Sequence, residues 1–306
     1  MFLKFGTVIL AFMTLLGAST QFEKSITPSK VYQEAMKLHK EVHLIKHYFG
    51  IQKEPELVEI KTELFPRYVW QRTYELFVKI NILREKYNLP MMEPVNMEPT
   101  LNLTPVFTYE QILRLLQEVK ILKLRLGITK ESDAITPYSN KTPTDVYNLL
   151  NMISRDFDLI NGKEFTPSYV FSEAIRIYED FQVIFNKLKL EDQTTPPLKD
   201  KNAKPKDSYR IALELLNTLK QIEIKMGLKS VDFYAFKRKN ITPGDVFEIT
   251  QAILAQLQMI KAHIGLTHAI TRGVKKQSDK TPADVAQMLE WLLKKSHKLL
   301  LSQKIR

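Results

Sequence analysis

Residues 142–160 read TPTDVYNLLNMISRDFDLI, and residues 281–299 read TPADVAQMLEWLLKKSHKL. Both stretches begin with Thr-Pro, carry Asp three residues after the Thr, and then place apolar residues at intervals of three and four. Thr is a favourable helix N-cap, and Pro fits the first helical position, where its missing N–H costs nothing. Each stretch therefore predicts an amphipathic α-helix with a defined start.

The same pattern recurs along the chain and always begins at a proline. The eight prolines are Pro28, Pro66, Pro105, Pro143, Pro167, Pro205, Pro243 and Pro282. Neighbouring members lie 38 or 39 residues apart, except for a step of 24 in the middle, and the last four follow the first four by 138 or 139 residues. Such self-similarity indicates repeated supersecondary units. It predicts four helical units that were duplicated once.

Positions within each unit are numbered here from its proline, so that position +3 is three residues after it. Positions +3, +7, +10, +14 and +17 are mostly apolar in all eight units, which is a seam along one face of a helix. Position +22 is usually Gly or Asn and is followed by Ile or Leu, a pattern typical of a helix C-cap. The units therefore predict eight helices of about 22 residues.

The predicted fold is all-α. It consists of two tandem four-helix-bundle-like domains that arose from an internal duplication, with long linkers between the helices. The domains cover residues 22–163 and 164–306, because only a tight joint separates Ile160 from Thr166. A helical solenoid is the alternative, but it is less compatible with one long helix per unit and with the short central step. Helix directions and oligomeric state stay open at this point.

The N-terminus predicts export. Lys4 precedes an uncharged, mostly apolar run from Phe5 to Leu16, and the small residues Gly17, Ala18 and Ser19 follow. This is the pattern of a signal peptide over residues 1–19, and the run is short for a membrane span. We expect a periplasmic or secreted product without a stable transmembrane span after signal removal; an uncleaved N-terminal membrane anchor is the alternative.

Composition excludes several chemistries. The 306 residues include no Cys, so disulfides, thiolate metal sites and cysteine nucleophiles are impossible. The formal net charge is +11, and Lys and Arg exceed Asp and Glu by 24 to 16 in residues 164–306 but only by 20 to 18 in residues 22–163. A basic second half is compatible with an anionic surface as partner. Export argues against nucleic acid.

Two groups of residues are candidates for binding a ligand or a partner. Position +4 is aromatic in seven units, where the rings either surround one end of each bundle or simply cover its core: Tyr32, Trp70, Tyr109, Tyr147, Phe171, Tyr209 and Phe247. Basic residues crowd three linkers of the second half and predict a basic rim if those linkers meet at one end: Lys204, Lys206, Lys237, Arg238, Lys239, Arg272, Lys275 and Lys276.

Three histidines, His39, His43 and His47, follow one another at intervals of four on the first helix. Two histidines one turn apart can reach one metal ion, but a site needs a third ligand from Glu34, Glu41 or another helix. The expectation is therefore no metal and no cofactor, with the histidines as a solvated flank of the seam and a metal site as the weaker reading.

No catalytic motif is recognisable, and the apolar seam predicts few buried ionisable groups. The first functional hypothesis is an exported, non-enzymatic interaction or scaffold protein that binds a macromolecular or envelope partner. The second is a periplasmic, sensory-type bundle that binds a small molecule, and the third and weakest is a metal-binding protein that uses the first-helix histidines.

Overall fold

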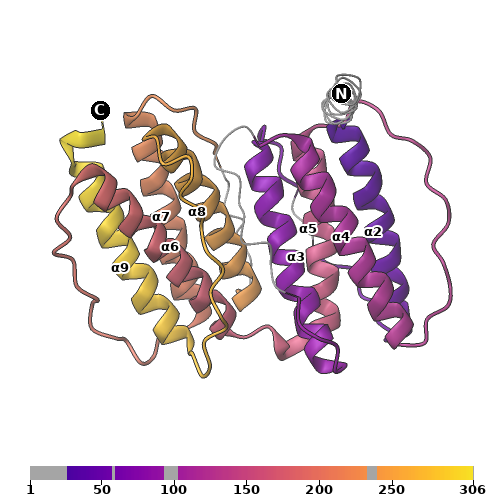
Figure 1. The fold of residues 1–306 in the computed structure, drawn as a ribbon. Helices are drawn as coiled ribbons and strands as arrows, with labels where there is room; N and C mark the ends of the chain where they lie inside the picture. Colours follow the sequence, from indigo (N-terminus) through magenta and orange to yellow (C-terminus); the bar gives the residue numbers. More distant parts are fainter. Residues whose placement is uncertain (1–25, 57–58, 93–102, 233–239, 306) are drawn as a thin grey trace, which may run out of the picture.

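The computed structural model describes residues 26–56, 59–92, 103–232 and 240–305. Within these ranges the chain forms eight α-helices and two short 3-10 helices, and it contains no strand (Figure 1). The α-helices are α2 (Pro28–Tyr48), α3 (Pro66–Lys86), α4 (Pro105–Arg125), α5 (Pro143–Asn161), α6 (Pro167–Leu188), α7 (Pro205–Lys225), α8 (Pro243–His263) and α9 (Pro282–Leu301). The all-α prediction is confirmed, whereas the predicted signal peptide lies outside the described residues.

Each helix begins at one of the eight prolines, and its ends are set by local chemistry. Thr142, Thr242 and Thr281 each form a capping box with the Asp three residues later. Position +22 adopts a left-handed backbone conformation in six units, and the next residue donates its N–H to the carbonyl five residues earlier: Gly50, Asn88, Gly127, Lys189, Gly227 and Gly265. This is the Schellman motif, in which Gly has no Cβ penalty.

The helices pack in two groups of four. In the first group α2 and α3 each contact both α4 and α5, and in the second group α6 and α7 each contact both α8 and α9. The two groups therefore have the same circular order of helices. The equivalence agrees with the repeat of four units in the sequence, while the ancestral duplication itself stays a prediction.

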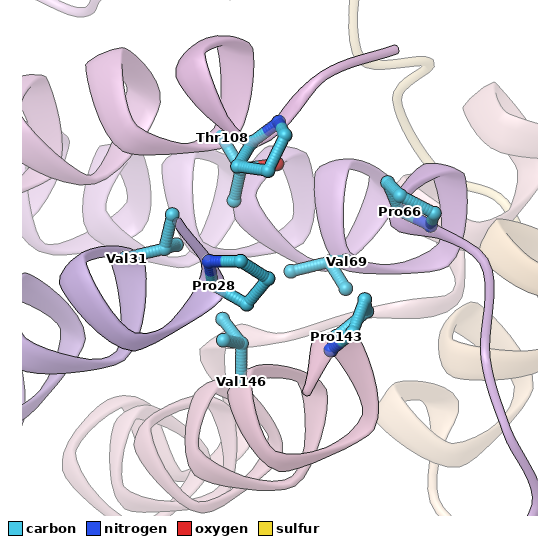
Figure 2. Close-up of a pocket in the computed structure, with 8 residues that line it drawn as sticks. Pro28, Val31, Pro66, Val69, Thr108, Pro143 and Val146 are labelled. Carbon is cyan, nitrogen blue, oxygen red and sulfur yellow. The ribbon is translucent and has the colours of Figure 1, made fainter. Parts of the chain in front are cut away.

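All four helices of a bundle run in the same direction. Pro28, Pro66, Pro105 and Pro143 converge at one end of the first bundle around a shallow depression, as Figure 2 shows for the labelled residues. The prolines that open α6–α9 converge in the same way in the second bundle. A parallel arrangement needs connections that return along the whole bundle. Residues 49–65, for example, can span about 55 Å, against about 31 Å for a helix of 21 residues.

The predicted seam forms the core of both bundles. Every residue at positions +3, +7, +10, +14 and +17 is less than 9% exposed, including the polar members Thr73, Thr108, Ser208, Thr250 and Ser296. Burial of each large apolar side chain contributes roughly 1.5–3 kcal/mol, which exceeds the contribution of a helix cap. Packing of the seam therefore dominates the stability of each bundle.

A ring of polar contacts surrounds the core of the first bundle and links position +18 of each helix to position +13 of the next. Lys46 of α2 pairs with Asp156 of α5, Arg84 of α3 with Glu118 of α4, and Lys123 of α4 with Glu41 of α2. The fourth contact is the Asn161 amide of α5, which donates to the Lys79 carbonyl of α3. In the second bundle Lys261 of α8 and Asp180 of α6 keep this pairing, with 2.7 Å between Nζ and Oδ1.

The two bundles point in opposite directions and meet along α3 and α8 (Figure 1). The start of α8 lies against the end of α5, since a Cβ built on Gly244 is 3.3 Å from Asp158 Oδ1. Most residues of α3 and α8 are buried, because each helix packs within its own bundle and against the other bundle. In the described part of the chain, no helix has the length and apolar character that a membrane crossing requires.

Candidate functional site

A layer of buried charges lies where the two bundles meet. Arg72, Glu75 and Lys79 of α3 are each no more than 1% exposed. Arg72 pairs with Glu75 and, at 2.7 Å, with Glu248 of α8, while Lys79 Nζ lies 2.9 Å from Glu75 Oε1 and 2.6 Å from Asp158 Oδ1. Burial raises the pKa of the Glu75 carboxyl, but the charges of Arg72 and Lys79 outweigh burial and hold this pKa below its usual value.

Arg155 of α5 extends the charged layer across the joint between the bundles. Its Nη1 lies 2.9 Å from Asp245 Oδ1, and its Nη2 donates to Glu248 at the start of α8. Each cation in the layer thus faces at least one carboxylate, which offsets the cost of removing the charges from water. The expectation of few buried ionisable groups is wrong. It considered the seam alone, whereas paired charges are also buried beside the seam, both between helices of one bundle and between the two bundles.

Beside this layer lies an open cavity of about 620 Å3, lined by α3, α6, α8 and the connections that follow α3 and α8. Its lining is mainly apolar and aromatic, from both bundles: Tyr74, Val78, Met91, Met92, Tyr169, Phe247 and Val274. The polar members are Asn81, Ser172, Glu173, Lys275 and Lys276. A volume of this size falls in the range of sites for small molecules, which typically combine apolar walls with a few polar groups.

Glu173 provides the buried charge of the cavity wall. Its side chain is 3% exposed, and its Oε2 accepts hydrogen bonds of 2.6 Å from both Arg176 and Gln251. Burial raises the pKa of the Glu173 carboxyl above its usual value, although the Arg176 guanidinium opposes the shift. Arg176 in turn lies over the Tyr74 ring, 4.1 Å from its centroid, so a cation–π contact holds it in place.

Two exposed lysines, Lys275 and Lys276, border the same cavity. The Lys275 carbonyl accepts a hydrogen bond from the Ser172 hydroxyl, which fixes the connection after α8 against α6. Lys276 Nζ lies 4.6 Å from the centroid of the Tyr169 ring. Positive charge therefore borders a cavity whose lining is mainly apolar, and this combination suits an amphipathic molecule with an anionic group near the lysines.

The predicted +4 aromatics do not form a shared binding ring. The depressions at the proline ends of the bundles are lined by the prolines and by position +3, not by position +4. Phe247 lines the cavity between the bundles, and Tyr147 accepts a hydrogen bond from Arg72 in the charged layer. Of the remaining members, Trp70 and Tyr209 are buried, whereas Tyr32, Tyr109 and Phe171 are half-buried and pack against the core.

The described members of the predicted basic rim lie at the start of α7 and along the connection that follows α8, and the rim itself stays a prediction. Lys204 and Lys206 are exposed at the start of α7. Arg272 lies beside the middle of α6, where its carbonyl accepts a hydrogen bond from Arg176, whereas Lys275 and Lys276 lie beside the first turns of α6, at Ser172 and Tyr169. The other three predicted members lie outside the described residues: Lys237, Arg238 and Lys239.

The histidines on α2 separate into a pair and an isolated member. His39 and His43 both face Asp156 of α5, whereas His47 is exposed. Burial lowers the pKa of His43, with contributions from His39 and Lys46, and the Asp156 charge only partly opposes this effect. The sequence left the third ligand open between Glu34, Glu41 and a residue of another helix, and the structure places Asp156 of α5 beside the pair.

Sequence reasoning missed the charged layer and the cavity. The available signal was the polar composition of α3 and α8 on the faces away from their seams, which includes Arg72, Glu75, Lys79, Glu248 and Gln251. A solvated face gives the same pattern, so only the contact between the bundles distinguishes the two cases. Comparisons of the chain with known protein families, curated proteins and solved structures found no match. Functional conclusions therefore rest on the geometry of this chain.

Proposed function

We propose that this protein binds an anionic amphipathic small molecule in the cavity between its two bundles. The observation that carries the proposal is a cavity of about 620 Å3 with mainly apolar walls and lysines at its border. The ligand's apolar part would contact Val78, Phe247 and Val274, and its anionic group would lie near Lys275 and Lys276. Among the three functional hypotheses from the sequence, this geometry favours the small-molecule one.

The Arg176–Glu173 pair helps to fix the shape of the cavity wall. Arg176 is held by both Glu173 and the Tyr74 ring, so residues from α6 and α3 are joined at the cavity wall. Because the wall is already ordered before binding, less conformational entropy of the protein is lost when a ligand binds. Because both bundles contribute to the lining, binding would also couple them, which is compatible with a sensory role.

Calorimetric titration with dodecanoate, at concentrations below micelle formation, tests the proposal, with dodecylamine as the cationic counterpart. Dodecanoate is expected to bind once per chain, and replacement of Val78 by Trp, which fills the cavity, should abolish binding. Lys275→Ala combined with Lys276→Ala should weaken binding roughly tenfold, since each exposed charge contributes up to about 1 kcal/mol. The matched control pair, Lys204→Ala with Lys206→Ala, should leave affinity unchanged. Equal affinity of the Val78→Trp variant would refute the proposal.

A second candidate function, the binding of a macromolecular partner, is favoured by the outer face of α4. Four large apolar side chains are exposed there: Phe107, Leu113, Ile121 and Leu124. Leu124 is 75% exposed, and an apolar patch on a helix face commonly marks an interaction surface. A pull-down from the native envelope fraction, with Leu124→Asp compared against wild type, tests this candidate. Retention of every captured partner by the variant would exclude this face.

A further inference from the structure

The strongest unassigned cluster lies between α2 and α5, on the side of the first bundle away from the charged layer. His39 and His43 are one turn apart on α2, and Asp156 faces them from α5. His39 Nε2 lies 3.5 Å and His43 Nε2 lies 3.2 Å from the same atom, Asp156 Oδ2. One atom from each of the three side chains therefore meets at a single point.

We propose that His39, His43 and Asp156 bind one divalent transition-metal ion, with Zn2+ as the best match. A zinc ion has ligand distances of about 2.0–2.1 Å in tetrahedral geometry, which separates neighbouring ligand atoms by about 3.3 Å. The two nitrogen–oxygen distances in the cluster agree with this separation. Two imidazoles and one carboxylate are also a usual ligand set for zinc, in contrast to the all-oxygen sets of Mg2+ and Ca2+.

Unsatisfied buried atoms provide a second and independent observation. The Asp156 side chain is fully buried, and neither its Oδ2 nor His39 Nε2 has a hydrogen-bond partner of normal geometry in the described part of the chain. A buried carboxylate oxygen whose close contacts lack hydrogen-bond geometry is costly, since its lost hydration is only partly compensated. A metal ion at this point would satisfy both atoms.

The neighbouring charges leave Asp156 available to a cation. Lys46 Nζ lies 2.9 Å from the other oxygen, Oδ1, and also 3.2 Å from Glu54 Oε2. Two carboxylates thus face one lysine, so the local charge without a metal ion is negative. Lys46 occupies one side of Asp156 and the histidines occupy the other.

The histidines are particular to this corner of the bundle. The Lys46–Asp156 pair belongs to the ring that links position +18 to position +13, and this pairing recurs at the Lys123–Glu41 contact without any histidine. His39 and His43 are positions +11 and +15, and no other unit has His at both. Stability of the bundle therefore accounts for the lysine–carboxylate pair but not for the two imidazoles beside it.

The site has a route to solvent. The side chains of His39 and His43 are 15% and 34% exposed, whereas Asp156 forms the closed floor. Three protein ligands with an open side leave the fourth tetrahedral position to water or to an exogenous ligand. His47 is exposed one turn further along α2 and lies outside this set.

Zinc titration of protein made without a histidine tag tests the proposal, after removal of metals with a chelator. Competition against a chromophoric zinc indicator should show one site per chain, and Co2+ should give the strong visible absorption of tetrahedral coordination. His43→Gln and Asp156→Asn should each weaken Zn2+ binding at least about tenfold, because loss of supporting groups alone costs 10–100-fold. The control variant, His47→Ala, should bind like wild type.

Helix circular dichroism of each variant separates loss of binding from loss of folding. If Asp156→Asn fails to fold, the His39→Gln and His43→Gln pair decides, since these side chains are partly exposed. Absence of a stoichiometric zinc site in wild type would overturn the proposal. So would unchanged affinity of a folded Asp156→Asn variant, because that result indicates ordinary binding by two surface histidines.

Discussion

Replacement of Glu223 by Gln should make the protein more stable at alkaline pH. Glu223 is position +18 of α7, where the first bundle places a cation or an amide, and its carboxylate is fully buried. Neither oxygen has a hydrogen-bond partner in the described part of the chain, and burial raises the pKa of Glu223 to about 8. The folded protein therefore holds a proton on Glu223 at neutral pH.

The sign and size of the effect follow from proton linkage. In the unfolded chain Glu223 ionises near its ordinary pKa of 4.5, so between pH 4.5 and about 8 the folded state binds one proton more than the unfolded state. Stability of the wild-type protein then falls as pH rises through this window, by about 1.4 kcal/mol per pH unit and about 5 kcal/mol in total. Gln resembles the protonated carboxyl and cannot ionise, so it removes this loss.

Urea denaturation at pH 5 and pH 9 measures the difference between variant and wild type. We expect near-equal stability at pH 5 and a gain on the order of 3–5 kcal/mol for the variant at pH 9. Glu290→Gln on the exposed face of α9 is the matched control and should give the same difference at both pH values. A Glu223→Gln effect that does not change with pH would show that the carboxyl is not held protonated.

Three further perturbations test the seam, the charged layer and a helix end. Ile253→Ala in the core of the second bundle should lower the free energy of unfolding by about 2–5 kcal/mol in urea titration, whereas Leu198→Ala at a 98% exposed position should change it by less than about 0.5 kcal/mol. Arg155→Leu removes the cation beside Asp245 and one of the two arginines beside Glu248, and it should cost about 3–5 kcal/mol; a loss below about 1 kcal/mol measured by the same titration would contradict the role of this layer. Gly227 has a φ of +73° and open space around a new Cβ, so Gly227→Ala should lower stability by about 1 kcal/mol through backbone strain alone. Thermal denaturation measures the effect, and an unchanged or higher midpoint would rule out this strain.

The fold was largely predictable because its determinants are local and repeated. The eight prolines, the seam and the residues at position +22 each act within one helix, and the structure places all of them as predicted. Helix direction was not predictable, since linkers of this length permit parallel and antiparallel neighbours alike. The common direction of the helices depends on how all four helices of a bundle pack together, and no pattern within one helix encodes it.

The candidate sites depend on contacts between distant segments, which periodicity within a helix does not encode. Asp156 looks like any exposed acidic residue until α5 is placed beside α2, and the cavity at Glu173 exists only because the second bundle lies against α3. The predicted aromatics were identified from their shared position, yet of the seven only Phe247 lines the cavity. Residues at the same position of a repeat therefore do not necessarily share a function.

The ring of contacts around the first bundle has a consequence for handedness. Four parallel rods of similar shape can be arranged clockwise or anticlockwise, and an apolar core alone barely distinguishes the two circuits. In the reverse circuit the Lys123 flank of α4 would meet Lys79 of α3, so two buried ammonium groups would face each other. In the observed circuit Lys123 meets Glu41, and Lys79 is free to join Glu75 and Asp158. This repulsive encounter would disfavour the reverse circuit.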